Sequence, residues 1–256
     1  MLKTNFLKSK LERGVQTIGT WNIINSPVVA DVISSCELDF LIVDGEHGSF
    51  SYETAQNIVF ACESNNVSPI MRIGEISENN ILKALDIGVH GIQIPCISSC
   101  DELDEVINFS KYPPEGKRGF SPFTRSGLYD QSNASKMTSI ANKNTLLIAG
   151  IENMEGIEVL PKLLEFEDLD IVFIGLYDLS KSMGIPGQIE DKKILTILDD
   201  IIKETHNAGK KIGTIATSLE FLKLLKNKKM DYITYSVDTG MLKNVYKDLL
   251  SNFKNI

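Results

Sequence analysis

The sequence predicts an α/β protein in which eight parallel strands alternate with helices and close into a barrel. Three observations lead to this fold class. Short apolar runs bounded by Gly, Pro or Asp, such as residues 39–44 and 169–174, are typical of parallel strands buried on both faces. A helix-like segment follows each run sooner or later, which implies a parallel sheet. Eight such units in 256 residues match a TIM (β/α)8 barrel, so we expect a single barrel domain over residues 1–256.

Each predicted strand is a short apolar run. The eight strands are predicted at residues 17–22, 39–44, 68–72, 90–95, 145–151, 169–174, 211–215 and 231–236. An open sheet that binds a dinucleotide would show G-x-G-x-x-G after its first strand. Here the first strand is followed by IINSP, and the chain contains no G-x4-G-K-S/T phosphate loop. The barrel is therefore favoured over a doubly wound open sheet.

The segments between the strands are predicted helices. The first shows clear start signals, because Ser26 can cap its N-terminus and Pro27 suits its first turn. The helices are predicted at residues 26–36, 52–65, 78–87, 101–110, 132–142, 155–165, 191–208, 218–226 and 239–253.

One long connection interrupts the regular alternation. Residues 111–127 (KYPPEGKRGFSPFTRSG) cannot form a helix because of their prolines and glycines, so we expect an elaborated loop over residues 111–142. Arg118 and Arg125 in this loop could bind substrate anions or could brace the loop against carboxylates.

The bulk composition is that of a soluble globular protein. A net charge of −8 argues against a nucleic-acid partner, which would favour a clustered basic surface. No apolar run approaches the roughly 18 residues of a membrane span, and the N-terminus lacks a signal-peptide pattern, so we expect no membrane partner and a cytoplasmic location. The four cysteines show no tight zinc pattern and are interpreted as reduced thiols, mostly in the core.

Two carboxylates at neighbouring strand ends predict a metal site. Glu152 lies on the same side of its strand as Gly150, facing the barrel mouth, and Asp178 follows the next strand. The carboxyl ends of barrel strands line the active site. Two carboxylates with water suit Mg²⁺ or Mn²⁺. The alternatives are structural, with Glu152 capping the following helix and Asp178 capping a short turn.

An acid–imidazole pair follows the second strand. Asp44 ends this strand, and His47 lies three residues later in a charged turn. A carboxylate near an imidazole fixes its tautomer and raises its basicity, as general-base catalysis requires. The alternative for His47 is a surface turn, while His90 and His206 are interpreted as structural.

Arg72 ends the neighbouring strand. Its guanidinium could bind a carboxylate or a developing oxyanion, or it could form a structural pair with Glu46 or Glu75. Trp21, the only tryptophan, ends the first strand and could pack under a substrate or only in the core. The lysines fall mainly on loops and polar helices, which argues against Schiff-base chemistry.

Several motifs occur in an order that resembles a known family. They are G-x-W (19–21), D-G-E-H (44–47), P-x-x-R (69–72), Y-P-P-x-G-x-R-G (112–119), x-I-E (150–152), F-I-G-x-x-D-L-S (173–180), S-M-G (182–184) and V-D-T (237–239). The chain resembles the HpcH/HpaI family of class II, metal-dependent pyruvate aldolases, typified by 4-hydroxy-2-oxoheptanedioate aldolase. The resemblance runs from about residue 14 to residue 250.

The resemblance implies roles for the candidate residues. Glu152 and Asp178 would hold a divalent metal, Mg²⁺ or Mn²⁺ and possibly Co²⁺. Arg72 would steady an enolate oxygen, and His47, oriented by Asp44, would transfer protons. The backbone N–H groups of the turn from Gly175 through Tyr177 to Asp178 would bind the pyruvate carboxylate. The family also implies a homo-oligomer, usually a hexamer (a trimer of dimers) whose dimers exchange the C-terminal helix.

The chain departs from the family pattern at three places. The family typically has Gln where this chain has Gly150, a position that helps to bind the keto acid. Tyr177 replaces a residue that is small in many members, and the loop after Gly119 is more aromatic than usual. These departures leave keto-acid positioning and acceptor choice open.

We therefore predict a divalent-metal-dependent carbon–carbon lyase (aldolase) that cleaves or forms a 4-hydroxy-2-oxo acid through a pyruvate enolate, with an aldehyde as the second substrate. The alternatives are related enolate chemistry, such as a CoA-ester lyase or an oxaloacetate-type decarboxylase, and a barrel that binds a metal and a keto acid without catalysis.

Overall fold

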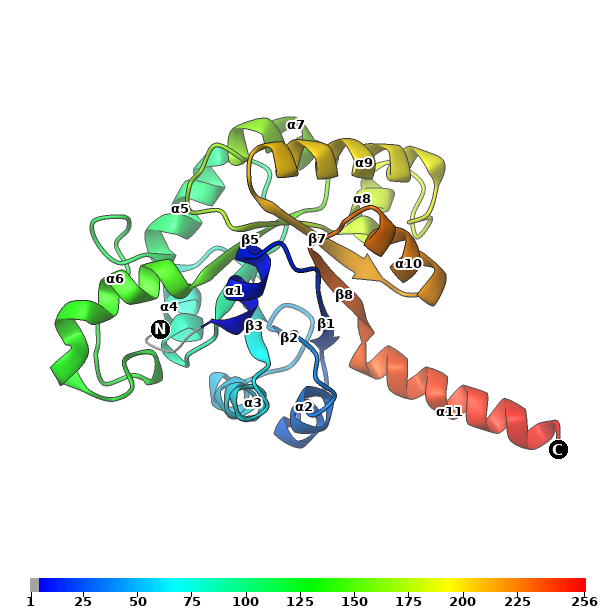
Figure 1. The fold of residues 1–256 in the computed structure, drawn as a ribbon, viewed down its shortest axis with the longest axis horizontal. Coiled ribbons are helices and arrows are strands. Elements are labelled where there is room, and N and C mark those ends of the chain that lie inside the picture. The colour runs from blue at the N-terminus through cyan, green and yellow to red at the C-terminus, as the bar shows by residue number, and fades with distance from the viewer. Residues whose placement is uncertain (1–4) are drawn as a thin grey trace.

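The computed structural model describes residues 5–256 and contains the predicted closed barrel. Eight strands pair in parallel with their sequence neighbours, and β8 closes onto β1 (Figure 1). The strands are β1 Thr17–Asn22, β2 Phe40–Asp44, β3 Ser68–Arg72, β4 Gly91–Ile94, β5 Leu146–Ile151, β6 Ile171–Ile174, β7 Lys211–Ala216 and β8 Tyr232–Val237. All eight predicted strands are thus confirmed, with ends that differ by at most two residues.

The helices surround the barrel, and the nine predicted ones are present. Ser26 caps α2 as predicted, because its side chain accepts a hydrogen bond from the Val29 N–H. The helices are α1 Phe6–Glu12, α2 Pro27–Ser34, α3 Tyr52–Ser64, α4 Glu78–Asp86, α5 Cys100–Ser110, α6 Ala134–Asn144, α7 Met154–Leu163, α8 Leu176–Ser182, α9 Lys192–Asn207, α10 Leu219–Asn227 and α11 Asp238–Lys254.

Two short helices, α1 and α8, were not predicted. α1 buries Leu7 and Leu11 in the cluster of side chains that fills the barrel interior, which also contains Phe40 and Tyr232. With only two buried residues in seven, its apolar pattern is too short to be distinguished from a coil. α8 directly follows β6 and carries Asp178 in its first turn.

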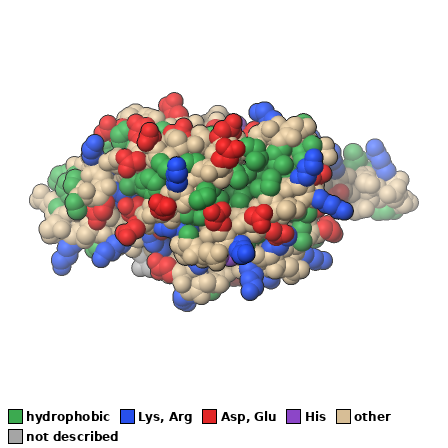
Figure 2. Space-filling model, turned by 90° about the horizontal axis from the view of Figure 1, so that it is seen from above, with side chains coloured by type: hydrophobic (Ala, Val, Ile, Leu, Met, Phe, Trp, Pro, Cys, Tyr) green, Lys and Arg blue, Asp and Glu red, His purple; other side chains and the backbone are tan. Residues whose placement is uncertain are grey.

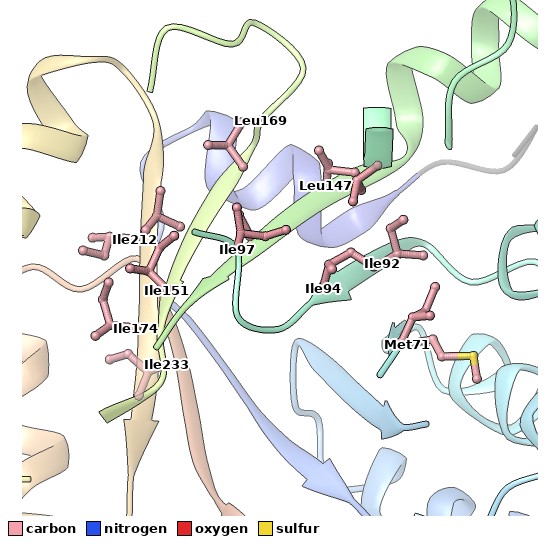
Figure 3. Close-up of a cluster of buried hydrophobic side chains, with 14 of the residues drawn as sticks. Met71, Ile92, Ile94, Ile97, Leu147, Ile151, Leu169, Ile174, Ile212 and Ile233 are labelled. Atoms are coloured by element: carbon pink, nitrogen blue, oxygen red, sulfur yellow. The ribbon is translucent and has the colours of Figure 1, made fainter. Parts of the chain in front are cut away.

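The strands separate two apolar cores. Alternate residues face outward toward the helices, and Figure 3 shows Ile92, Ile94, Ile151 and Ile174 in this outer cluster. The residues between them face the barrel interior. Because side chains alternate along a strand, Arg72, Gln93 and Glu152 continue the inward-facing series of β3, β4 and β5 toward the mouth.

The elaborated loop contains two short 3-10 turns, Arg125–Gly127 and Gln131–Asn133, and its arginines brace it against the barrel. Arg118 donates to Asp86 at 2.7 Å and stacks on Tyr112, while Arg125 pairs with Glu63. Of the two roles predicted for these arginines, the structure shows the bracing one.

The C-terminal helix α11 projects away from the barrel (Figure 1), and Asp238 is its only buried residue. Figure 2 shows one face of the molecule, on which acidic and basic side chains are interspersed. Among the helices within residues 5–256, none has both the length and the apolar character needed to cross a bilayer.

Candidate active site

The ends of β2 and β3 hold a buried ion pair. The register places Asp44 beside Arg72, and two hydrogen bonds join them, Nε to Oδ1 at 2.9 Å and Nη2 to Oδ2 at 2.6 Å. Asp44 Oδ1 also accepts the backbone N–H groups of Glu46 and His47, each at 3.1 Å. Asp44 therefore fixes both the guanidinium and the turn that follows β2.

Two further contacts hold Arg72. Its Nη1 lies 2.9 Å from Oε2 of Glu46, and its guanidinium carbon lies 4.3 Å from the centre of the Trp21 ring. Glu46 is thus one of the two structural partners considered from the sequence, whereas Glu75 instead accepts from Asn80. Trp21 is buried and supports the guanidinium, so its role in the structure is packing under Arg72.

His47 is exposed beside this pair. Within the described chain, its ring makes no hydrogen bond, and Asp44 binds the backbone of His47 instead of its imidazole. The structure thus brings Asp44 and His47 together as parts of one turn, without the carboxylate–imidazole contact that the sequence suggested. The other two histidines lie elsewhere, with His90 bonded to Ser68 and His206 to Asp231.

Glu152 is a buried carboxylate at the end of β5, and two glycines make room for it. A Cβ atom at Gly175 would lie 2.7 Å from Cγ of Glu152, and one at Gly150 would lie 3.2 Å from Oε1. The Cys96 thiol donates to Oε2 at 3.1 Å. Glu152 does not cap α7, because Asn153 accepts from the Gly156 N–H and does so instead.

The environment of Glu152 disfavours its charge. Burial is the main reason why the pKa of Glu152 lies above its ordinary value. The hydrogen bond from Cys96 lowers this pKa, whereas the negative charge of Asp178 raises it further. A cation between these carboxylates would offset both the cost of burying the Glu152 charge and the repulsion between the two negative charges.

Asp178 lies in the first turn of α8, with its side chain about half exposed. Among residues 5–256, its side-chain partner is Lys181, whose Nζ lies 3.5 Å from Oδ1 of Asp178. Gly175 is the N-cap residue of α8 and provides no side-chain cap, and Tyr177 is exposed beside Asp178. Because the charge of Asp178 acts on Glu152, the two carboxylates share one electrostatic environment at the mouth.

The donor set fits a hard divalent cation. Glu152 and Asp178 provide carboxylate oxygens, which Mg²⁺ and Mn²⁺ prefer. In the part of the chain that the structure describes, no three His, Cys, Asp or Glu side chains converge into a closed metal site. Two protein carboxylates leave positions for water and for a chelating substrate, as Mg²⁺ binding requires.

The sequence interpretation missed two residues of this region, Cys96 and Gln93. Cys96 lies two residues after the end of β4 with a positive φ of 54°, and it is exposed, although the cysteines were expected mostly in the core. Partial desolvation of its thiol, with a contribution from the Glu152 carboxylate, raises the thiol pKa to about 12. Because Cys96 follows the end of a strand, the sequence could have placed it at the barrel mouth. Gln93 is the polar residue inside the apolar run GIQI of β4.

Comparison with known proteins gives consistent matches over the whole chain. The profile of the family described as HpcH/HpaI aldolase/citrate lyase matches residues 17–244. A hydroxypyruvate/pyruvate aldolase of Roseobacter denitrificans is 28% identical over 253 residues, which cover 98% of this chain and 97% of that protein.

Two solved structures share the fold. An HpcH/HpaI aldolase from Desulfitobacterium hafniense superposes with a TM-score of 0.93 at 25% identity, covering 99% of this chain and 98% of the other. The citrate synthase SbnG superposes with a TM-score of 0.89 at 26% identity, covering 98% of both chains. These similarities support an aldolase-type carbon–carbon lyase. Since the family profile spans nearly the whole barrel, the chain belongs to the HpcH/HpaI aldolase/citrate lyase family.

Proposed function

We propose that this protein cleaves or forms a 4-hydroxy-2-oxo acid through a pyruvate enolate, with Mg²⁺, Mn²⁺ or Co²⁺ held by Glu152 and Asp178. The observation that carries the proposal is the buried Glu152 carboxylate, which lies within electrostatic reach of both Asp178 and the guanidinium of Arg72. When bound, the metal would act as a Lewis acid toward the carbonyl of the keto acid.

Arg72 is assigned to the enolate oxygen. Of its five N–H groups, two donate to Asp44, while Glu46 lies beside Nη1 as an ion pair, so N–H groups remain that can donate to a substrate. Because the guanidinium is held before the reaction, it stabilises developing negative charge with little reorganisation. Of the backbone N–H groups from Gly175 to Asp178, that of Gly175 already donates to the Ile151 carbonyl oxygen at 3.0 Å. The N–H groups of residues 176–178, in the first turn of α8, are therefore assigned to the substrate carboxylate; no side chain caps this helix.

His47 is assigned to proton transfer. In the cleavage direction, a base takes the proton of the C4 hydroxyl, the C3–C4 bond breaks, and the aldehyde leaves. The electron pair of that bond stays as the enolate, which takes up a proton at C3 to give pyruvate. The exposed imidazole of His47 can exchange this proton with solvent, since no side chain among residues 5–256 is hydrogen-bonded to its ring nitrogens.

Proton exchange on pyruvate tests this function directly. The protein with Mg²⁺ or Mn²⁺ should exchange the methyl protons of pyruvate with deuterated water, as followed by NMR, and EDTA should stop the exchange. Glu152→Gln should lose the exchange, while the remote surface variant Asp199→Asn should keep it. No exchange with any divalent metal would reject the proposed function.

Related enolate chemistry is the second candidate. It is favoured by Gly150, where the family typically has Gln, and by the similarity to the citrate synthase SbnG. Turnover of oxaloacetate or an acyl-CoA without aldolase activity would support it. Calorimetry that detects pyruvate binding without turnover of any substrate would instead indicate a barrel that only binds.

We also propose a homo-oligomer in which α11 packs on a second copy of the chain. α11 exposes Met241, Leu242, Val245, Tyr246, Leu249, Leu250 and Phe253. An apolar groove between α2, β1 and the start of α11 offers a complementary surface, with Val28 and Val32 on its wall. Contiguous exposed apolar patches are typical of protein interfaces.

Light scattering would test the assembly. Val245→Asp together with Leu249→Asp should reduce the mass of the particle, whereas Lys247→Glu on the same helix should not. An unchanged mass for the double variant would exclude this interface. The hexameric state, the helix exchange and the cytoplasmic location stay predictions.

A further inference from the structure

Gln93 is a buried amide without a partner in the barrel wall. It is fully buried on β4, and neither its side-chain nitrogen nor its oxygen has a hydrogen-bond partner among residues 5–256. Its neighbours Ile92 and Ile94 face the outer cluster, so the side chain of Gln93 points into the barrel interior (Figure 3).

An amide in this position needs a physical reason. A buried polar group without a hydrogen bond costs about 1–3 kcal/mol, and native proteins satisfy nearly all such groups. The inward-facing residues of the neighbouring strands β3 and β5 include Ile70 and Ile148, and an aliphatic side chain would suit the position better. The hydrogen bonds of Gln93 are therefore expected to form with a molecule that enters the barrel mouth.

The register places this amide next to the candidate site. Gln93 pairs with Arg72 on β3 and with Ile148 on β5, and Gly150 lies two residues farther along β5 toward the mouth. Interior side chains of a barrel stack in layers toward its mouth. Because Gly150 has no side chain, this position of β5 contributes no polar group to the layer next to Gln93.

Position 150 cannot readily contribute a side chain of its own. A Cβ atom there would lie 3.0 Å from the Ile94 carbonyl oxygen and 3.0 Å from Cα of Pro95, both backbone atoms of the segment that ends β4. That segment is also tied to Gly150, whose carbonyl oxygen accepts the Ile97 N–H at 2.8 Å. A polar contact on this side of the mouth must therefore come from a neighbouring strand, and Gln93 is the polar residue of β4.

We propose that Gln93 is a substrate-positioning residue whose amide NH₂ donates to an oxygen of the 2-oxo acid, beside the guanidinium of Arg72. The inference rests on the proposed function, because it assigns a further contact in the same site. A neutral amide adds directionality without adding charge, so its contribution falls on substrate binding more than on enolate stabilisation.

Replacement by apolar residues of similar size tests the inference. In Gln93→Leu and Gln93→Met, the KM for pyruvate in the proton-exchange assay should rise about tenfold, which corresponds to about 1.4 kcal/mol, with kcat changed by less than about threefold. The melting temperature should stay equal or rise, because a buried amide without a partner is removed. Two variants are used so that a folding defect in one does not prevent the test.

Thr205→Val is the matched control, because Thr205 on α9 is also fully buried, and its hydroxyl has no hydrogen-bond partner among residues 5–256. It should leave the KM unchanged. A KM within twofold of wild type in both Gln93 variants would overturn the inference and would mean that internal water satisfies the amide. Calorimetric titration of pyruvate into the protein in the presence of Mg²⁺ distinguishes failure of this inference from failure of the proposed function. If wild type binds pyruvate without exchanging its protons, the proposed function fails, and the affinities of the Gln93 variants still decide the role of Gln93.

Discussion

Removal of the Asp44 carboxylate should affect stability and activity together. Asp44 has a side chain that is 1% exposed, and it makes two hydrogen bonds to Arg72 and two to backbone N–H groups. Loss of one partner from a buried ion pair costs about 3–5 kcal/mol. Glu46 still neutralises part of the guanidinium charge in Asp44→Ala, so we expect the lower end, about 3 kcal/mol.

For a chain of this size, about 3 kcal/mol corresponds to a fall in melting temperature of about 6–12 °C. Because Arg72 loses the contacts that aim it, kcat/KM should also fall by about 100-fold. Circular dichroism on heating and the pyruvate exchange assay measure the two effects. Asp199→Ala is the control, since Asp199 is half exposed and its pair with Lys228 should contribute less than about 1 kcal/mol. The reasoning is wrong if Asp44→Ala melts within 2 °C of this control or keeps wild-type activity.

Two more predictions concern the carboxylate and the thiol at the mouth. Burial raises the pKa of Glu152, so the metal-free protein binds the proton of this carboxyl more tightly when folded than when unfolded. The stability that this proton contributes is lost as the pH rises through the raised pKa. In urea at pH 7, metal-free Glu152→Gln should therefore be at least as stable as wild type, and the difference in unfolding free energy should vanish toward pH 4.5. The affinity of the variant for Mn²⁺ should fall at least tenfold. A variant that is less stable than wild type at pH 7 would contradict this reasoning. Partial desolvation and the hydrogen bond to the Glu152 carboxylate raise the pKa of the Cys96 thiol, although Cys96 itself is exposed. At pH 8, iodoacetamide should therefore alkylate Cys96 more slowly than an unstructured cysteine peptide, as followed by mass spectrometry. Equal rates for Cys96 and the peptide would show that the thiol is not held as the structure indicates.

Much of the barrel could be predicted from the sequence because its signals are local. Apolar runs with sharp ends identified the strands, and the bounds of β1 and β3 agree with the prediction at both ends. Ser26 and Pro27 marked the start of α2 through capping chemistry that involves only adjacent residues. The position of charged residues after strands likewise indicated which end of the barrel forms the site.

Contacts within the site depended on how the strands lie against one another. The sequence placed Asp44, Arg72 and Glu152 at strand ends, but only the register of β2 against β3 decided that Asp44 binds Arg72 and not the ring of His47. The thiol contact of Cys96 with Glu152 joins residues 56 positions apart. Such pairs follow from register and closure, which no local pattern encodes.

By itself, the sequence determined the order of strands and helices and which charged residues follow the strand ends, because periodicity, capping and chain order act over a few residues. Tertiary structure alone decided which of those groups are partners, that two glycines make room for Glu152, and that the amide of Gln93 is buried without a partner. The physical reason is that burial and hydrogen bonding depend on neighbours brought together by barrel closure, often from distant parts of the chain.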